Sequence, residues 1–397
     1  MSSSAAEAVR VAAVSVSAAL GGSEWSLLDF AARAARRGIA LTVVLPKDGP
    51  LRERLDAAGV ATVIAPADAA FLELTQREML SAGGLMTLQR GLRAWARAIG
   101  AAVRGLPGGP PAVLYSNGFK AHLACALVRG PKRVWHLREY PPELTRILWR
   151  LLAGALPHAT IANSRAVAEA WRLGGFAPAA VPNGVDLERF TPSPATGWVH
   201  EQLGVAREAV LLGMPAAFAR WKGQFAVVDA FERAADRIPQ AHLVLAGAAI
   251  YDTNAERGYA QELVARVQRA AALAQRIHFL KFQTEPWRLY PELTVALHFS
   301  LRPEPFGRVI VEALACGVPA IAARAGGPLE TVEAGVTGWL VPQGDVAALA
   351  DAMVTALAAD LAPMRAACRA RAEQLYSAER YADEVAAILR GQAGRTR

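Results

Sequence analysis

Two glutamates stand on either side of a Pro-Phe-Gly turn in the stretch RPEPFGRVIVEALACGVPAIA (302–322). The prolines next to Glu304 disfavour a helix there, so this glutamate is expected in a loop. A helix is expected to begin near Gly307, which places Glu312 little more than one turn inside it. Free N–H groups at a helix start suit a phosphate anion. A carboxylate one turn further along would meet the vicinal hydroxyls of a ribose attached to that phosphate.

A simpler interpretation exists for the second glutamate. Arg308 and Glu312 are four residues apart, and on an exposed helix they would form a surface ion pair worth only ~0.3–0.5 kcal/mol. For two isolated glutamates this interpretation is favoured. The surrounding sequence therefore has to decide between a ligand site and a surface pair.

Short apolar runs alternate with helix-period runs along the whole chain, which predicts an α/β protein. Helical patterns cover 23–37, 51–59 and 377–391. The expected strands are 9–17, 39–45, 60–65, 112–116, 133–137, 159–163, 209–214, 242–247, 276–280, 295–300, 318–323 and 338–342. These patterns predict two doubly wound parallel sheets, which meet near the Asn-, Gly- and Pro-containing segment 181–194. Ligands of such sheets bind outside the carboxyl ends of the strands.

The length of 397 residues exceeds the roughly 250–300 at which single cores stop growing, so two domains are expected. We expect an N-terminal domain over 1–185, a C-terminal domain over 186–376 and a final helix over 377–397. Residues 1–185 hold 21 Lys+Arg against 12 Asp+Glu, whereas 186–397 hold 22 against 23. The first half is therefore expected to face an anionic partner, such as a membrane surface, a phosphorylated acceptor or nucleic acid.

The cysteines and the apolar segments bear on the compartment. Three cysteines lie far apart without metal-ligand spacing, which favours a reduced, cytosolic protein. No basic segment followed by a long apolar core opens the chain, and no window of ~18 apolar residues lacks a charge. Neither a signal peptide nor a transmembrane helix is expected.

One helical segment of the basic half has an amphipathic pattern. LMTLQRGLRAWARAIGAAVRG (85–105) places leucines, Trp95, Ile99 and Val103 at helical spacing, with four arginines between them. A basic amphipathic helix can lie on an anionic membrane. Packing of the apolar stripe on the protein's own sheet is the more common arrangement and is favoured here.

The opening stretch resembles the signature of retaining GT-B glycosyltransferases that use nucleotide sugars, the glycosyl transferases group 1 type with an E-x7-E motif. The resemblance extends over nearly the whole chain in family order. The similar segments are GGSEWSLLDFAARAARRGIALTVVLP (21–46), VPNGVDLERF (181–190), WKGQ (221–224), RIHFLKFQTE (276–285) and EPFGRVIVEALACGVPAIA with GGPLETVEAGVTGWLVPQGD (326–345). It implies a GT-B fold, in which two Rossmann-like domains face each other and a C-terminal helix crosses back to the first.

The resemblance also implies roles for residues of the second domain. Glu304 matches the glutamate that contacts the donor sugar, and Glu312 matches the one that contacts the ribose. Lys222 matches the lysine that neutralises the diphosphate, whose charge grows as the nucleoside diphosphate leaves. Backbone amides of Gly307, Arg308 and Val309 match those that hold the distal phosphate.

Further roles are implied in the first domain. His136 falls where the family places a histidine beside the reacting sugar, although a strand-end histidine bonded to the backbone is the alternative. Gly21 and Gly22 match the first glycine-rich loop, near the donor phosphate. The acceptor-side candidates are Glu24, Arg138 and Glu139. The loop GGSEWS lacks the G-x-G-x-x-G of dinucleotide-binding folds, so a nicotinamide enzyme is disfavoured.

Two features concern the diphosphate. Aligning WKGQ places Ala217 where the family usually has an arginine, and Arg220 is the nearest substitute donor-binding residue. No D-x-D motif occurs in the sequence, so a bridging metal is not implied and none is expected. The positive charge is then expected from Lys222 and backbone amides.

These patterns predict a glycosyltransferase that moves a sugar from a nucleotide diphosphate sugar to an acceptor hydroxyl with retention. The expected pathway is cell-envelope polysaccharide or glycolipid synthesis, with a lipid-linked or anionic acceptor and no separate cofactor. We expect a cytoplasmic protein at the inner membrane face, and no nucleic-acid partner. The alternatives are a non-catalytic nucleotide-sugar or nucleic-acid binding protein and a GT-B sugar-nucleotide epimerase.

Overall fold

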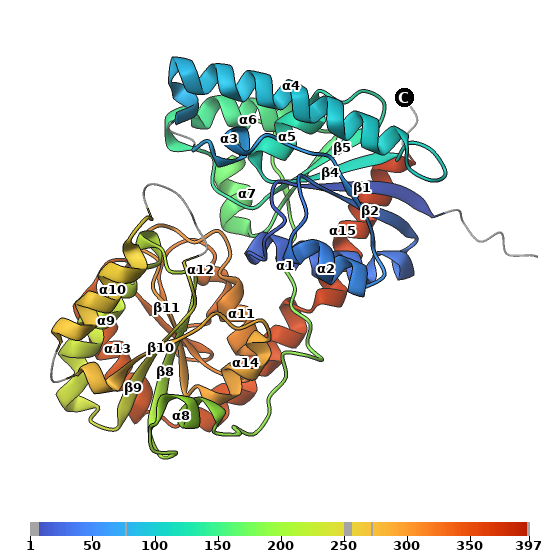
Figure 1. Cartoon of the computed structure of the whole chain (residues 1–397). Helices are drawn as coiled ribbons and strands as arrows, with labels where there is room; N and C mark the ends of the chain where they lie inside the picture. Colours follow the sequence, from blue (N-terminus) through green and yellow to red (C-terminus); the bar gives the residue numbers. More distant parts are fainter. Residues whose placement is uncertain (1–7, 76–77, 250–255, 271–272, 395–397) are drawn as a thin grey trace, which may run out of the picture. The chain divides into compact units, whose positions relative to one another are not determined.

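The computed structural model describes residues 8–75, 78–249, 256–270 and 273–394 (Figure 1). The chain divides into two compact units. Unit 1 comprises Met1–Gly184 with Ala378–Arg397, and unit 2 comprises Val185–Ser377. Each division lies one residue from the corresponding boundary expected from the sequence.

Unit 1 is built on a seven-stranded sheet whose named strands all pair in parallel, in the order β3-β2-β1-β4-β5-β6-β7. The first six strands confirm the six expected in this half, and the two-residue β7 is additional. Their bounds are β1 Val9–Ser15, β2 Ile39–Leu45, β3 Ala61–Ile64, β4 Val113–Asn117, β5 Lys132–Leu137, β6 Ala159–Ala162 and β7 Ala179–Ala180. The strand order reverses between β1 and β4, so the loops that follow these strands flank a switch point of the kind that binds ligands.

Helices cover both faces of this sheet, because successive side chains of a strand point to opposite faces. One face packs against α1 (Gly22–Ala34), α2 (Pro50–Ala57) and α15 (Ala378–Ala393). The other face packs against five helices. These are α3 (Ala69–Glu73), α4 (Ala82–Arg104), α5 (Phe119–Ala126), α6 (Arg146–Ala155) and α7 (Arg165–Trp171).

Unit 2 contains a six-stranded sheet in the order β10-β9-β8-β11-β12-β13, again with parallel pairings throughout the named strands. All six lie at the segments expected from the sequence. Their bounds are β8 Val210–Pro215, β9 Ala241–Ala246, β10 Ile277–Leu280, β11 Val295–His298, β12 Ala320–Ala323 and β13 Gly338–Val341. Here the order reverses between β8 and β11, which makes the loops after those two strands the expected place for a ligand.

The helices of unit 2 also form two layers. One core joins the sheet to α9 (Gln224–Ala234), α10 (Tyr259–Arg269) and α13 (Val346–Ala358). The second core joins it to α8 (Trp198–Leu203), α11 (Arg308–Ala315) and α14 (Leu361–Leu375). A short α12 (Pro328–Thr331) follows β12. The 3-10 helices of the chain are 35–37, 78–80, 143–145, 220–222, 235–237, 274–276, 286–288 and 290–292.

Helix α15 is held to unit 1 by apolar and ionic contacts. Tyr381, Val385 and Leu389 are buried in the same core as α1. Arg33 and Arg37 both contact the Glu379 carboxylate, at 2.8 and 2.5 Å. The last helix therefore forms part of the first unit, although the whole of unit 2 precedes it in the chain.

Helix α4 settles the two interpretations of segment 85–105. Trp95, Ile99 and Val103 are buried, and the Trp95 indole N–H donates to the Ala65 carbonyl at 3.0 Å. The Ser81 hydroxyl caps the helix by accepting from the Gly84 N–H. The apolar stripe packs on the sheet, so assigning this stripe to a membrane is wrong.

Within the described ranges, no single helix is both long enough and apolar enough to cross a bilayer. Only α13 and α14 taken together have the length and composition, and they bend by 107° where they meet.

Candidate active site

The loops after β8 and β11 bring the predicted lysine and the first predicted glutamate together. The Lys222 ammonium donates to Oε2 of Glu304 at 2.8 Å, and the Ser300 hydroxyl donates to the same oxygen at 2.9 Å. Both charged side chains are largely buried, with 14% and 12% of their surface exposed. The ammonium also lies 4.0 Å from the centre of the Trp221 ring. Two residues 82 positions apart thus form one ion pair.

A glycine allows this approach of the two loops. Gly223 follows Lys222 with a φ of 81°, and a Cβ added there would lie 2.2 Å from the Phe299 carbonyl oxygen. The Leu301 N–H donates to the Trp221 carbonyl at 2.7 Å. Any side chain at position 223 would therefore push the lysine loop away from the glutamate loop.

The Glu304 carboxylate is ionised despite its burial. Burial alone would raise its pKa, but the Lys222 charge and the neighbouring His298 outweigh that effect. The pKa of Glu304 consequently lies well below its usual range. The site therefore holds Glu304 as a carboxylate.

His298 is part of this cluster, and sequence reasoning missed it. Its Nε2 lies 3.2 Å from Oε2 of Glu304, and its ring is 4% exposed. Both ring nitrogens are buried, and neither makes a hydrogen bond that meets the usual geometry among the described residues. The available signal was a histidine at the end of the apolar strand pattern VALHFS.

The second predicted glutamate also forms a buried ion pair. Oε1 of Glu312 accepts from Nε of Arg308 at 2.7 Å, and Oε2 accepts from the Tyr290 hydroxyl at 2.7 Å. The Arg308 and Glu312 side chains are 9% and 8% exposed. The pair is therefore not the surface ion pair of the simpler interpretation. Tyr290, from the 3-10 helix 290–292, is a second contact that the sequence did not suggest.

Gly307 begins the helix that carries Glu312. It takes a left-handed conformation with a φ of 83° and stands at the N-cap of α11. The first N–H groups of a helix lack partners within the helix, and its N-terminus carries partial positive charge. The amides of Gly307, Arg308 and Val309 are the ones at this end, three to five residues beyond Glu304.

Arg220 does not join this cluster in the structure. Its guanidinium makes two bonds to the Glu262 carboxylate of α10, at 2.8 and 2.7 Å, and lies over the Tyr259 ring. Arg220 was expected to replace the arginine that is missing at position 217. In the structure its guanidinium is bonded to α10 and does not take that place. The pair is about half exposed, so it contributes little to stability.

His136 was expected beside a reacting sugar, and the structure corrects this. The side chain is 0% exposed, because it lies on the same face of β5 as Val134, which α1 and α15 cover. Nδ1 bonds to the Tyr115 hydroxyl and lies 3.4 Å from Nη2 of Arg138. Burial also holds the pKa of His136 well below its usual value. A neutral ring enclosed in the core has no surface to offer a sugar.

Arg138 forms hydrogen bonds with several segments of unit 1. Its guanidinium donates to the side chains of Asn117, Asn183 and Tyr381, from β4, the interdomain segment and α15. These partners are neutral, and the residue is 8% exposed. The guanidinium therefore holds these segments together, rather than standing free for an acceptor as expected.

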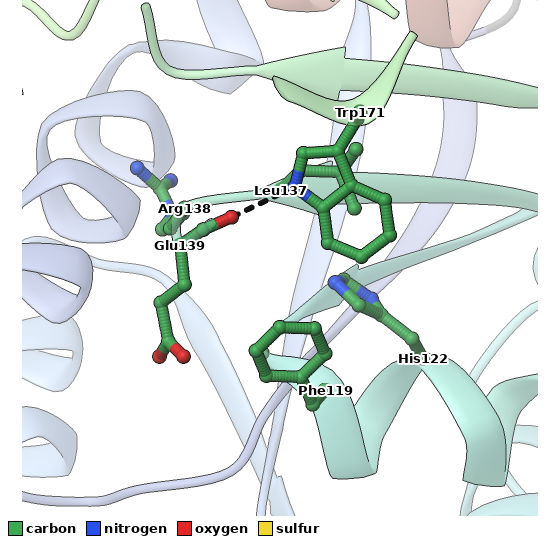
Figure 2. Close-up of a pocket in the computed structure, with 7 residues that line it drawn as sticks. Phe119, His122, Leu137, Arg138, Glu139 and Trp171 are labelled. Atoms are coloured by element: carbon green, nitrogen blue, oxygen red, sulfur yellow. Dashed lines mark hydrogen bonds between the residues drawn. The ribbon is translucent and has the colours of Figure 1, made fainter. Parts of the chain in front are cut away.

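Glu139 and Glu24 lie near this arginine. Arg138 and Glu139 line a small pocket, in which the Trp171 indole N–H donates to the Glu139 carbonyl at 2.8 Å (Figure 2). The Glu139 carboxylate points away from the rings of Phe119 and His122, and the residue is exposed. Burial raises the pKa of Glu24, while the Arg138 charge acts in the opposite direction. Glu24 is thus a buried carboxyl group close to the Arg138 guanidinium.

Gly21 and Gly22 begin α1 after β1. Gly21 is the N-cap in an extended conformation, and a Cβ there would lie 2.8 Å from a Glu24 carboxylate oxygen. A Cβ on Gly22 would meet no atom within 4 Å. Close approach therefore explains the first glycine, while the protein alone gives no steric reason for the second.

No group of three or more His, Cys, Asp or Glu side chains suited to a metal ion occurs in the described part of the chain. At the carboxyl ends of β8 and β11, the two ion pairs described above supply one ammonium, one guanidinium and two carboxylates. Such a set suits a ligand that carries both anionic oxygens and hydroxyl groups.

Comparisons with known proteins bear on both units. Residues 199–375 match the family model of glycosyl transferases group 1, and residues 20–189 match that of glycosyltransferase family 4. The chain is 31% identical over 206 residues to a GDP-mannose-dependent alpha-(1-6)-phosphatidylinositol monomannoside mannosyltransferase of Mycolicibacterium smegmatis, covering 48% of this chain and 50% of that protein. It is 33% identical over 193 residues to a D-inositol 3-phosphate glycosyltransferase of Geodermatophilus obscurus, covering 45% and 40%. The chain spans about half the length of the curated relatives it matches.

Solved structures resemble the chain over most of its length. Anabaena Alr3699/HepE in complex with UDP-glucose superposes with a TM-score of 0.81 at 26% identity, covering 96% of this chain and 99% of that one. Sucrose-phosphate synthase from Thermosynechococcus elongatus superposes with a TM-score of 0.78 at 20% identity, covering 96% and 98%. The second likeness concerns the fold alone.

Proposed function

Because the chain belongs to the group 1 glycosyltransferases and has their GT-B fold, we propose that it moves a sugar from a nucleoside diphosphate sugar to an acceptor hydroxyl. One observation carries this proposal, the buried Lys222–Glu304 ion pair beside the N-terminus of α11. A fold alone does not establish a function, so the proposal rests on what this site can bind.

The proposed roles follow from charge and position. The Lys222 ammonium and the first amides of α11 bind the diphosphate, and Glu312 accepts hydrogen bonds from the ribose hydroxyls. Glu304, released from the ammonium, accepts hydrogen bonds from hydroxyls of the donor sugar. Because positive groups meet the leaving diphosphate where its charge grows, they lower the barrier to breaking the glycosidic bond.

We further propose retention of the anomeric configuration. No carboxylate nucleophile is assigned, and the departing phosphate oxygen takes the proton from the acceptor hydroxyl. The proposed reaction requires no cofactor besides the donor and no bridging metal ion. NMR of the anomeric proton of the product tests retention.

For the acceptor, we propose a lipid-linked or anionic molecule used in glycolipid or envelope polysaccharide synthesis. The excess of 21 basic over 12 acidic residues in 1–185 supports this choice. So does the similarity to a protein named as acting on a phosphatidylinositol mannoside. The corresponding location is the cytoplasmic face of a membrane, with peripheral association.

A thermal-shift panel of nucleoside diphosphates and their sugars tests the donor class. A ligand that binds only the folded protein raises the melting temperature in proportion to the logarithm of its concentration. We expect UDP or GDP and the matching sugar nucleotide to raise it, and Lys222→Met to abolish the shift. Arg233→Met, which removes an exposed cation of the same unit, is the matched control and should keep the shift.

Two outcomes favour the alternatives. A shift by nucleotide sugars without transfer to any acceptor, but with release of an altered sugar, indicates an epimerase. Tight nucleic-acid binding at physiological salt without any nucleotide shift indicates a nucleic-acid binding protein.

A further inference from the structure

Helix α6 of unit 1 exposes an apolar stripe. Leu144 is 83% exposed, Ile147 65%, Leu148 54% and Leu151 56%. Their spacing of three and four residues places all four on one side of the helix and the turn that precedes it. Large apolar side chains exposed singly need no explanation, but four on one helical face form a patch.

The opposite side of α6 is already packed. Trp149, Leu152 and Ala153 belong to a core with α5 and α7, and the Phe119 and Trp149 rings meet at 4.7 Å between centroids. The Arg150 guanidinium donates to the Ala170 carbonyl at 2.8 Å. The helix is thus fixed by one side, and its outward stripe is not part of the core of unit 1.

The part of the chain that contains this stripe is rich in basic residues. Residues 82–155 hold 11 Lys+Arg and two Asp+Glu, whereas the whole chain has a net charge of +8. Helix α4 contains no acidic residue and exposes four arginines on its outer side, namely Arg90, Arg93, Arg97 and Arg104. Helices α4 and α6 cover the same face of the sheet with α5 between them, so both outer surfaces lie on one side of the unit (Figure 1).

We propose that this side of unit 1 is a docking surface for an anionic lipid bilayer. We call it the α4–α6 face and define it by Leu144, Ile147, Leu148 and Leu151 with the four exposed arginines of α4. The apolar stripe enters the boundary between headgroups and acyl chains, and the arginines meet lipid phosphates. This docking surface would explain how the protein reaches the membrane location proposed above. It rests on the proposed function only for the reason why the protein binds a membrane.

The charge favours a bilayer over other occupants. A second copy of the chain docked through the same face would bring its own arginines against these, and like charges in contact oppose association. An apolar protein groove would cover the stripe but leave the arginines without partners. An anionic bilayer satisfies both groups at once.

Cosedimentation with vesicles tests the inference. We expect the full chain to bind vesicles of phosphatidylcholine mixed with phosphatidylglycerol, but not vesicles of phosphatidylcholine alone. Added salt should weaken the binding, because it screens the arginines. Replacing all four stripe residues by glutamine should weaken binding by at least about tenfold. The triple change R90Q, R93Q and R97Q should weaken it by about a hundredfold.

Matched variants keep the result interpretable. Val264→Gln with Val336→Gln removes exposed apolar residues of unit 2 and should bind vesicles like the wild type. Because the stripe is exposed, its variant should keep the melting temperature of the wild type. Wild-type vesicle affinity in the stripe variant overturns the inference, and so does a stripe-dependent dimer in sedimentation equilibrium without lipid.

Nucleoside diphosphate binding is measured on the same variants. Vesicle binding without any nucleotide binding would refute the proposed function and leave the docking surface intact. If the chain binds nucleotides but does not bind anionic vesicles, only the docking surface is refuted.

Discussion

Buried charged side chains have different kinds of partner in the two units. In unit 2, Lys222–Glu304 and Arg308–Glu312 are pairs of opposite charge beyond the carboxyl ends of the central strands β8 and β11. In unit 1, the Arg138 guanidinium is held by two asparagines, a histidine and a tyrosine. An ammonium paired with a carboxylate can exchange that partner for a phosphate, whereas a cation held by neutral groups from four segments fixes those segments. This difference supports the proposed ligand binding by the first arrangement and indicates a positioning role for the second.

The largest effect is expected from removing the charge of Glu304. We expect Glu304→Gln to lower sugar transfer roughly 10²–10³-fold, since the amide cannot accept the same hydrogen bonds from the donor sugar. Steady-state transfer from the donor found by thermal shift measures this effect. Glu208→Gln, an exposed carboxylate of the same unit, is the control. Full activity of Glu304→Gln would remove Glu304 from the site.

Arg138→Lys should act on stability. Lysine keeps the positive charge but loses the forked geometry, so we expect the free energy of unfolding to fall by about 2–3 kcal/mol. Urea unfolding measures this change, with Arg129→Lys on the surface as control. Unaltered stability together with a raised KM for the acceptor would show instead that Arg138 meets the acceptor directly.

His298 tests whether the unit 2 cluster extends beyond the ion pair. His298→Leu removes the ring nitrogen 3.2 Å from Glu304 and should lower transfer about tenfold, the effect of one lost polar contact with a charged group. His298→Gln can place an amide N–H close to the same point and should restore most of the activity. Equal losses in both variants would indicate that His298 only fills space.

The smallest effect concerns stacked histidines of unit 2 outside this cluster. Nδ1 of His242 lies 2.9 Å from Nε2 of His278, and burial, with the His242 charge second, lowers the pKa of His278 to about 4. Between pH ~6.5 and ~4 this histidine is therefore protonated in the unfolded chain but not in the native protein. The free energy of unfolding consequently falls as the pH falls. Burial also lowers the pKa of His242, with Arg276 and His200 adding to the effect.

Because His278 is only half buried, we expect this effect to remove roughly 1 kcal/mol between pH 7 and pH 5. Urea unfolding of His278→Gln at both pH values measures it, and the variant should lose correspondingly less stability on acidification. An identical loss in wild type and variant would place the pH sensitivity elsewhere.

The sequence predicted what depends on local pattern. Apolar alternation located twelve of the strands, and the family resemblance singled out Glu304, which lies in the loop before α11, and Glu312, which lies within α11. The Lys222–Glu304 contact was not predicted, because it depends on the reversal of strand order between β8 and β11, which places the loops after these strands side by side.

The errors concern side-chain direction and distant partners. His136 was misplaced because the faces of β5 are distinguished only by what packs on them, here α1 and α15. Arg220 was misplaced because its partner, Glu262, lies 42 residues away on α10. For the same reason, His298 and Tyr290 were recognised only from their contacts with the two glutamates.

The two basic helices of unit 1 show the same limit. The amphipathic pattern of α4 is the more regular in the sequence, yet its stripe is buried, while the apolar residues of α6 lie on both sides and one side remains exposed. A sequence pattern states that apolar side chains share a face. The packing of the neighbouring helices decides whether that face is covered.

We propose above all that Lys222 exchanges Glu304 for a diphosphate. A crystal structure grown with the sugar nucleotide that gives the largest thermal shift tests it most directly. We expect diphosphate oxygens within hydrogen-bond distance of the Lys222 ammonium and of the amides at Gly307, Arg308 and Val309, with Glu304 turned to the sugar. A donor bound elsewhere, with the lysine still on the glutamate, would contradict it.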